Sequence, residues 1–211
     1  MISAAQTDGS GLVVSKNSGI SSVQDLAGKS IATPGEASIQ YMLLQYYLEQ
    51  NGMSLKDLKV SSMKVPSMND ALKTNKIDGM ITFEPYVTIA EKNGATVLAG
   101  SQDILPDHPC CVVVASDKFL EEHPNETNTI LKIHENATNF INNNSDEAAS
   151  MIPSDIVSDV EVEKVAISSF PFISGLDDSF KQDVMDFMNL EVDLGVLKQP
   201  ISQDKIFWDG S

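Results

Sequence analysis

Short apolar segments alternate with helical patterns between Lys29 and Gly100, and this alternation constrains the fold more than any other feature of the chain. Each segment is brief, rich in apolar or β-branched residues, and bounded by polar or turn residues, which predicts strands. The predicted strands are Ser30–Thr33, Lys59–Val65, Gly79–Phe83 and Ala95–Ala99. Strands joined by helices of this length form right-handed crossovers. We therefore predict an α/β unit with a mostly parallel sheet and helices on both faces.

Three helical patterns separate these strands. The longest begins after Ser38 and closes at Gly52, a typical stop signal. Its apolar side recurs at helical spacing through Ile39, Met42, Leu43, Tyr46 and Tyr47. A shorter helix is predicted over Ser67–Asn75, with Met68, Ala71 and Leu72 inward, and another over Tyr86–Asn93.

The segments outside residues 29–100 do not alternate between strands and helices in this way. Ser10–Asn17 and Cys110–Ser116 are predicted strands, the second of them buried, and the chain after them is mainly helical. Two apolar stripes mark these later helices: Ile130, Ile133, Ala137, Phe140 and Ile141, then Phe180, Val184, Phe187 and Met188. We predict one lobe from residues 29–100, inserted into a second, discontinuous lobe formed by residues 1–28 and 101–211.

Charge narrows the choice of partners. The chain carries 14 cationic and 30 acidic residues, a net charge of −16, and every cation is lysine. A nucleic-acid binder needs a basic surface that releases counterions, so nucleic acid is excluded as a partner. Without arginine, a bound anion must be held by backbone amides, hydroxyl groups or lysine.

The two cysteines, Cys110 and Cys111, are adjacent. On a strand, adjacent side chains point to opposite faces, so we expect no internal disulfide, and no metal-ligand spacing is present. No apolar run approaches the ~20 residues of a membrane span, and the first residues lack the pattern of a signal peptide. We expect either a protein that is soluble where it is made or one whose leader has been removed.

The turn from Thr33 to Ser38 is the first candidate binding feature. A glycine-containing turn from a strand into a helix presents unpaired N–H groups, which favours a ligand at Gly35, Glu36 and Ser38. The alternative is purely structural, because Thr33, Pro34 and Glu36 also match a capping box. Both interpretations stay open.

The second candidate feature is the turn Phe83–Tyr86. Glu84, Pro85 and Tyr86, after Thr82 in the preceding strand, can hydrogen-bond and stack on a small ligand, or Pro85 simply opens the next helix. His108 can titrate near neutrality, although a single histidine in a proline-flanked connector is more often a turn residue. No catalytic motif, metal-binding motif or phosphate loop accompanies these residues, so we predict neither a catalytic residue nor a cofactor.

The segments SGISSVQDLAGKSIATPGEAS, ALKTNKIDGMITFEPY and HPCCVVVASDKFLEEHPN resemble, in order, the substrate-binding proteins of nitrate, sulfonate and taurine ABC importers and their pyrimidine-precursor-binding relatives. This resemblance implies a type II periplasmic-binding-protein fold, in which two lobes joined by hinge strands close over a small solute. It also implies delivery to a permease, a location outside the cytoplasm, and ligand contacts at Ser38 and at Glu84–Tyr86. Ser10 and Gly11 are weaker candidates.

Members of that family have further strands and helices of the first lobe before the point where this sequence starts. The resemblance therefore implies an incomplete first lobe, covered by a homodimer, by strand exchange or by a further segment. A sulfonate-like, nitrate-like or aminopyrimidine-like solute fits the family. An enzyme on the same scaffold, such as one for pyrimidine-precursor synthesis or chorismate dehydration, and a truncated or regulatory effector domain are the alternatives.

Overall fold

The computed structural model describes residues 1–153 and 159–210, which form two compact units. Unit 2 comprises residues 9–106, and unit 1 combines residues 1–8 with 107–211. The predicted boundaries, after residues 28 and 100, differ from these. The reason is that β2 (Ser10–Val14) pairs between two strands of the unit 2 sheet and so belongs to that unit.

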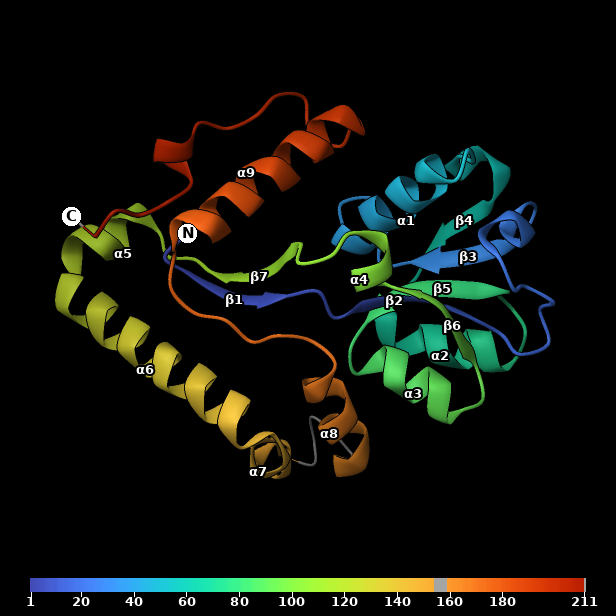
Figure 1. The fold of residues 1–211 in the computed structure, drawn as a ribbon, viewed down its shortest axis with the longest axis horizontal. Helices are drawn as coiled ribbons and strands as arrows, with labels where there is room; N and C mark the ends of the chain where they lie inside the picture. The colour runs from blue at the N-terminus through green and yellow to red at the C-terminus, as the bar shows by residue number, and fades with distance from the viewer. Residues whose placement is uncertain (154–158, 211) are drawn as a thin grey trace. The chain divides into compact units, whose positions relative to one another are not determined.

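The sheet of unit 2 has five strands in the order β4-β3-β5-β2-β6 (Figure 1). Four of them are β3 (Ser30–Thr33), β4 (Lys59–Ser62), β5 (Gly79–Phe83) and β6 (Thr96–Gly100), close to the predicted ranges. The strand β3 runs parallel to β4 and β5, whereas β2 is antiparallel to β5 and β6. The sheet is therefore mixed: β3, β4, β5 and β6 run parallel to one another, which agrees with the prediction of a mostly parallel sheet, and β2 runs the other way. The cause is that β2 precedes the strand–helix–strand units and enters the sheet from their carboxyl edge.

Helices cover both faces of this sheet (Figure 1). The helix α1 (Ile39–Gln50) contacts β5 from one side, and α2 (Val65–Lys73) and α3 (Tyr86–Lys92) contact it from the other. Short helical turns complete the unit: η1 (Val23–Leu26), η2 (Leu55–Asp57) and α4 (Ser101–Ile104). The inward residues predicted for α2, Met68, Ala71 and Leu72, are buried and pack with Val13 and Met80. The two-sided α/β prediction is confirmed.

The buried side of α1 differs in part from the predicted stripe. Met42 and Leu43 are buried as expected, but Ile39, Tyr46 and Tyr47 are only half-buried. Gln40, Leu44 and Leu48 are buried instead. The helix contacts the sheet through a face centred nearer Leu44, and the two tyrosines lie half-buried at the border of that face.

Asp78 ties the start of β5 to the start of β3. Its Oδ2 accepts hydrogen bonds from the Ser30 N–H (2.8 Å) and the Ser30 hydroxyl (2.7 Å). These bonds hold the pKa of the Asp78 carboxyl below its usual range. The stabilising effect is therefore present above the ordinary carboxyl pKa and is lost as the pH falls through the lowered value.

We expect Asp78→Asn to lower the free energy of unfolding by about 1 kcal/mol at neutral pH, because the carboxylate is partly exposed and its interactions are screened. The difference from the parent protein should shrink as the pH falls. Urea unfolding at a series of pH values measures it, with the exposed Asp70→Asn on α2 as the control. If the stability difference between Asp78→Asn and the parent protein stays the same at acidic pH, the effect does not come from the ionised carboxylate.

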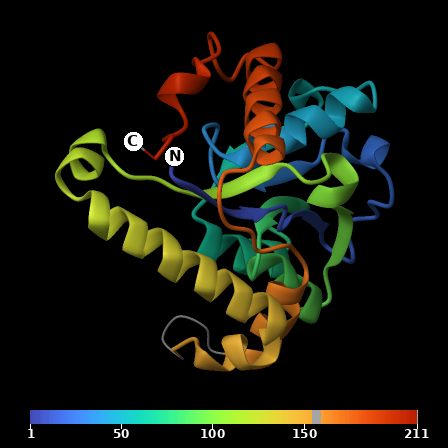
Figure 2. The same cartoon turned by 60° about the vertical axis from the view of Figure 1, so that its left-hand side comes forward.

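Unit 1 contains a two-stranded antiparallel sheet of β1 (Ser3–Thr7) and β7 (Pro109–Val113). The other edge of β1 bonds to residues 171–175. The helices of this unit are α5 (Asp117–Glu122), α6 (Pro124–Asn143), α7 (Ser145–Met151), α8 (Val160–Ser168) and α9 (Asp178–Asp193), followed by η3 (Gln203–Lys205) (Figure 2). The strand β7 was predicted to be buried, but only Pro109 is, because β7 pairs with β1 alone among the described residues.

The predicted apolar stripe of α6 is largely on the wrong side of that helix. Ile130 and Ile133 are exposed, and only the far end of the stripe, Phe140 and Ile141, packs against a small cluster with α7 and α8. The face that turns inward carries Thr127 and Thr138, and between them His134 contacts the Ala4 carbonyl oxygen through Nε2 at 2.8 Å. Polar bonding to β1, rather than apolar periodicity, sets the orientation of α6. The α9 stripe is placed as predicted, with Phe180 and Met188 buried.

The two cysteines lie on β7 and are both free, as expected. Their side chains do not diverge, however, because their sulfur atoms are 4.0 Å apart. The strand is bulged at this point: consecutive Gln6 and Thr7 on β1 pair with Cys111 and Pro109, so Cys110 has no partner. A bulge breaks the alternation of side chains that the sequence argument assumed.

Candidate functional site

The carboxyl edge of the unit 2 sheet gathers most of the predicted site residues. The strands β3 and β5 end there, β2 starts there, and α1, α3 and α4 begin beside it. In open α/β sheets the ligand lies at this edge. The residues brought to it are Ser10, Gly11, Gly35, Glu36, Ser38, Thr82, Glu84, Pro85 and Tyr86.

A buried polar contact fixes the start of β2 against α1. The Ser10 hydroxyl accepts a hydrogen bond from the Gln40 side-chain amide at 3.0 Å, and both residues are buried. The Ser10 N–H donates to the Ser101 hydroxyl of α4 at 3.2 Å. Sequence reasoning missed Gln40 and Ser101. A glutamine one residue from an apolar helix stripe gives no signal of burial, and its contact with Ser10 spans 30 residues.

The N-terminus of α1 is capped by Ser38. Its hydroxyl oxygen accepts from the Tyr41 N–H at 3.2 Å and its O–H donates to the Gly35 carbonyl at 2.6 Å. Gly35 has φ +143°, a conformation that side chains rarely adopt. The expected capping box starting at Thr33 is absent, because Thr33 still belongs to β3 and the helix begins at Ile39.

This cap leaves donors in the first turn of α1. In the described part of the chain, the N–H groups of Ile39 and Gln40 have no hydrogen-bond acceptor. Unpaired N–H groups and the positive end of the helix dipole favour an anion or an oxygen acceptor here. Glu36 lies in the preceding turn and is exposed.

Two buried hydroxyl groups at this edge are unpaired. The Oγ1 atoms of Thr33, at the end of β3, and Thr82, near the end of β5, are fully buried and have no hydrogen-bond partner in the structure. Their register places them on opposite faces of the sheet. An unpaired buried hydroxyl costs stability, on the order of 1–3 kcal/mol. Such a cost is typical of residues kept for function.

The turn after β5 holds Glu84 in a structural role. Its carboxylate accepts from the Thr88 N–H and the Thr88 hydroxyl, both at 3.0 Å, and so caps the start of α3. Pro85 follows a cis peptide bond and is the N-cap residue of α3. Tyr86 packs edge-on against Phe83, with ring centroids 5.9 Å apart. The turn thus offers an aromatic surface, while the carboxylate is already bonded within the protein.

Two further predicted residues occupy constrained positions. Gly11 pairs with Thr82, and a Cβ at Gly11 would lie 3.2 Å from a Val87 methyl group, so α3 packs directly on its backbone. His108 lies in unit 1, with a fully buried side chain whose Nδ1 is 3.2 Å from the Asp8 carboxylate. It also stacks on Phe187 of α9. A ligand role for His108 stays a prediction.

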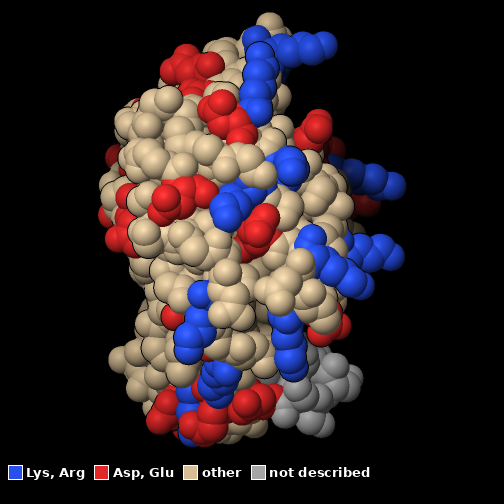
Figure 3. Space-filling model, turned by 90° about the vertical axis from the view of Figure 1, so that its right-hand side faces the viewer, with Lys and Arg blue, Asp and Glu red and all other residues tan. Residues whose placement is uncertain are grey.

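The negative charge of the chain is unevenly divided. Unit 2 has eight lysines and nine acidic residues, a net charge of −1, so unit 1 carries −15 of the total −16. Lysine and acidic side chains are interspersed on the face of the molecule shown in Figure 3. The unit that bears the candidate site is therefore close to neutral and does not repel an anion as the whole-chain charge suggests.

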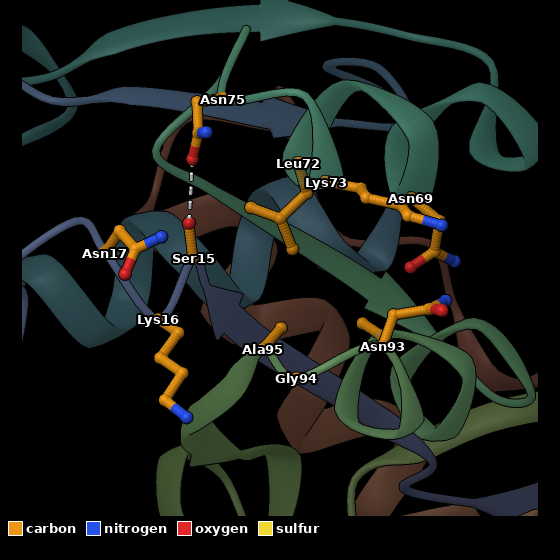
Figure 4. Close-up of a pocket in the computed structure, with 11 residues that line it drawn as sticks. Ser15, Lys16, Asn17, Asn69, Leu72, Lys73, Asn75, Asn93, Gly94 and Ala95 are labelled. Carbon is orange, nitrogen blue, oxygen red and sulfur yellow. Dashed lines mark hydrogen bonds between the residues drawn. The ribbon is translucent and has the colours of Figure 1, made fainter.

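A cavity of about 340 Å³ lies at the opposite, amino edge of the unit 2 sheet (Figure 4). Lys16 and Asn17 from the turn after β2, Lys73 and Asn75 from the end of α2, and Asn93 from the end of α3 line it. None of the predicted site residues contributes. The two helices point their C-terminal ends at it, which disfavours an anion, and its polar side chains are mainly exposed. The carboxyl edge is the better candidate.

The edge has the chemistry of a binding site. It supplies hydroxyl, amide and backbone N–H donors, with an aromatic pair beside them, and no nucleophile paired with a base. The described residues contain no group of three or more His, Cys, Asp or Glu that could hold a metal ion. Within the described ranges, no helix has the length and apolar character needed to cross a bilayer.

A family model and a curated relative both match this chain. The NMT1-like family matches residues 2–153. A Bacillus subtilis (strain 168) protein named "Putative aliphatic sulfonates-binding protein" is 29% identical over 187 residues, which cover 84% of this chain. The match spans 54% of the relative, so the chain corresponds to about half of its length.

Solved structures agree on the fold. The periplasmic aliphatic sulphonate binding protein SsuA from Escherichia coli superposes with a TM-score of 0.80 at 15% identity, over all of this chain and 69% of that one. The desulfurization enzyme DSZB gives a TM-score of 0.72 at 13% identity, over 97% of this chain and 75% of its own. The fold is therefore that of a periplasmic binding protein, as the sequence resemblance implied, and this fold is shared by binding proteins and an enzyme.

Proposed function

The chain belongs to the NMT1-like family, and from this premise we propose that it is the solute-binding component of an ABC importer. It captures a small polar solute outside the cytoplasm and delivers it to a permease. The importer relatives and the binding chemistry of the unit 2 edge support this role. The proposal includes a homodimer in which a second copy of the chain covers the exposed surface of unit 1.

The ligand is a small oxyanion of the sulfonate or nitrate type, bound at the carboxyl edge of the unit 2 sheet. The observation that carries this choice is the set of donors on the α1 side of that edge: among the described residues, the N–H groups of Ile39 and Gln40 and the unpaired hydroxyl of Thr33. A helix N-terminus binds oxyanions through such donors without arginine. The alternative, an aminopyrimidine-like solute, depended on Glu84 as an acceptor, and Thr88 already occupies that carboxylate.

A catalytic role has less support at this edge. Catalysis would need a positioned acid or base. Glu84 is bonded to Thr88, Glu36 is exposed in a turn, and His108 is buried against Asp8 in unit 1. The similarity to importer components therefore supports a binding role. Turnover of a bound sulfonate would contradict this proposal.

Isothermal titration of the full chain with ethanesulfonate, taurine, nitrate and an aminopyrimidine tests the ligand class. We expect Gln40→Met to weaken binding of the preferred oxyanion by about 10-fold or more, because it removes the amide that holds Ser10 at the edge. Gln45→Met is the matched control, since Gln45 lies on the same helix and its side-chain amide donates to Glu49 at the surface. Equal affinities in the two variants, or binding of the aminopyrimidine alone, would refute the proposed site.

A further inference from the structure

The two thiols of β7 form a side-chain pair that the solute-binding role does not use. The bulge at Cys110 turns the neighbouring thiols toward each other, and their sulfur atoms lie 4.0 Å apart. Cys111 is exposed and Cys110 is half-buried, so the pair is open to solvent on one side. The chain has no other cysteine, so no third thiol of the same molecule competes for either sulfur.

The separation of the sulfurs matches a bridging metal ion. Two metal–thiolate bonds of about 2.3 Å place their sulfurs ~3.8 Å apart at a tetrahedral angle and ~4.6 Å apart when collinear. A disulfide instead needs sulfurs about 2 Å apart, so the backbone would have to move to form one. The observed 4.0 Å falls within the range for one ion and outside that for a bond between the sulfurs.

We propose that Cys110 and Cys111 form a two-coordinate site for one thiophilic d¹⁰ cation of the Cu(I) or Ag(I) class. Each thiol releases one proton and each sulfur donates one electron pair to the cation, so no oxidant or reductant takes part. Thiolates select soft cations of this kind.

The residues around the two thiols determine how many protein ligands the cation has. The described residues offer no third His, Cys, Asp or Glu to form a metal-binding group, which excludes the four protein ligands of a structural zinc site. The net charge of −15 on unit 1 attracts cations to this unit. The thiols belong to unit 1, whereas the donors of the proposed oxyanion site belong to unit 2.

The test uses Ag(I), which does not change oxidation state, on the full chain reduced with a phosphine. Native mass spectrometry should show one Ag(I) per chain, and a thiol assay should lose both free thiols when the ion is added. Two linked sulfurs raise affinity through effective concentration, so Cys110→Ser and Cys111→Ser should each lose about 100-fold in competition with glutathione. Val112→Ser, the next residue on the same strand, is the matched control and should keep wild-type affinity.

Circular dichroism of each variant checks that the fold is kept. The proposal fails if either single-thiol variant holds Ag(I) as strongly as the parent protein, because one sulfur then suffices. It also fails if the ion appears only in species containing two chains, since the thiols then bridge molecules instead of closing on one ion. Neither result affects the oxyanion titration, so the two proposals are judged separately.

Discussion

Gly79→Val should destabilise unit 2 by about 3 kcal/mol, the upper end of the cost for overfilling a packed interior. Gly79 starts β5 in the middle of the sheet, and a Cβ there would lie 2.9 Å from Ile31 Cδ1 and 3.0 Å from the Val13 carbonyl oxygen. The carbonyl belongs to the backbone of the neighbouring strand β2, which cannot move aside without breaking its ladder. A branched side chain therefore separates strands on both sides of β5.

Urea unfolding measures this effect separately in the two units. All four tyrosines lie in unit 2 and the single tryptophan, Trp208, lies in unit 1, so the two fluorophores report on different units. Gly100→Val is the matched control, because a Cβ at Gly100 meets only side-chain ends of Gln102 and Asp103 at 3.4 Å, and we expect it to cost less than about 1 kcal/mol. Equal losses in both variants would show that valine itself, and not the close packing at Gly79, is responsible.

The structure of unit 2 was largely predictable because its signals are local. The strands at Ser30–Thr33 and Gly79–Phe83 have the predicted bounds, and the inward residues of α2 are those that its periodicity indicated. Neighbouring residues determine such features. The position of β2 between β5 and β6 depends on pairings between residues 65 to 89 positions apart, which no local pattern encodes.

The errors in unit 1 have the same origin. Apolar periodicity predicts which side of α6 is buried only if an apolar surface covers that side, and here the other side turns inward, where His134 contacts the Ala4 carbonyl oxygen of β1. The bulge at Cys110 depends on the register between β1 and β7, which lie about 100 residues apart. The rule that side chains alternate along a strand therefore failed for Cys110 and Cys111, because the bulge interrupts the pairing of β1 with β7.

The candidate site was predictable in position but not in detail. Glycine, serine and proline at strand-to-helix turns marked the carboxyl edge correctly, because those residue types are required by the turn itself. The same signals cannot show that Glu84 is already bonded to Thr88, that Gln40 reaches Ser10, or that Thr33 and Thr82 lack partners. Side-chain positions in the folded chain decide each of these.

Thr33→Val should raise stability and weaken binding, whereas Thr82→Val should raise stability alone. Each replaces an unpaired, fully buried hydroxyl by a methyl group of similar size, so the free energy of unfolding should rise by about 1 kcal/mol. The Thr33 hydroxyl lies on the same face of the sheet as α1, so if it donates to the bound oxyanion, affinity should fall by about 10- to 100-fold in Thr33→Val. The Thr82 side chain faces α3, so Thr82→Val should keep the parent affinity. The measurements are urea unfolding without ligand and isothermal titration with the preferred oxyanion.

Thr88→Val is the control for Thr33→Val and Thr82→Val, because it should change stability in the opposite direction. Its hydroxyl is equally buried but donates to Glu84 at 3.0 Å, so the same substitution should lower the free energy of unfolding by about 1 kcal/mol. A loss of stability in Thr33→Val or Thr82→Val would show that these hydroxyls are bonded in solution. Gained stability with unchanged affinity in Thr33→Val would show instead that the oxyanion binds elsewhere.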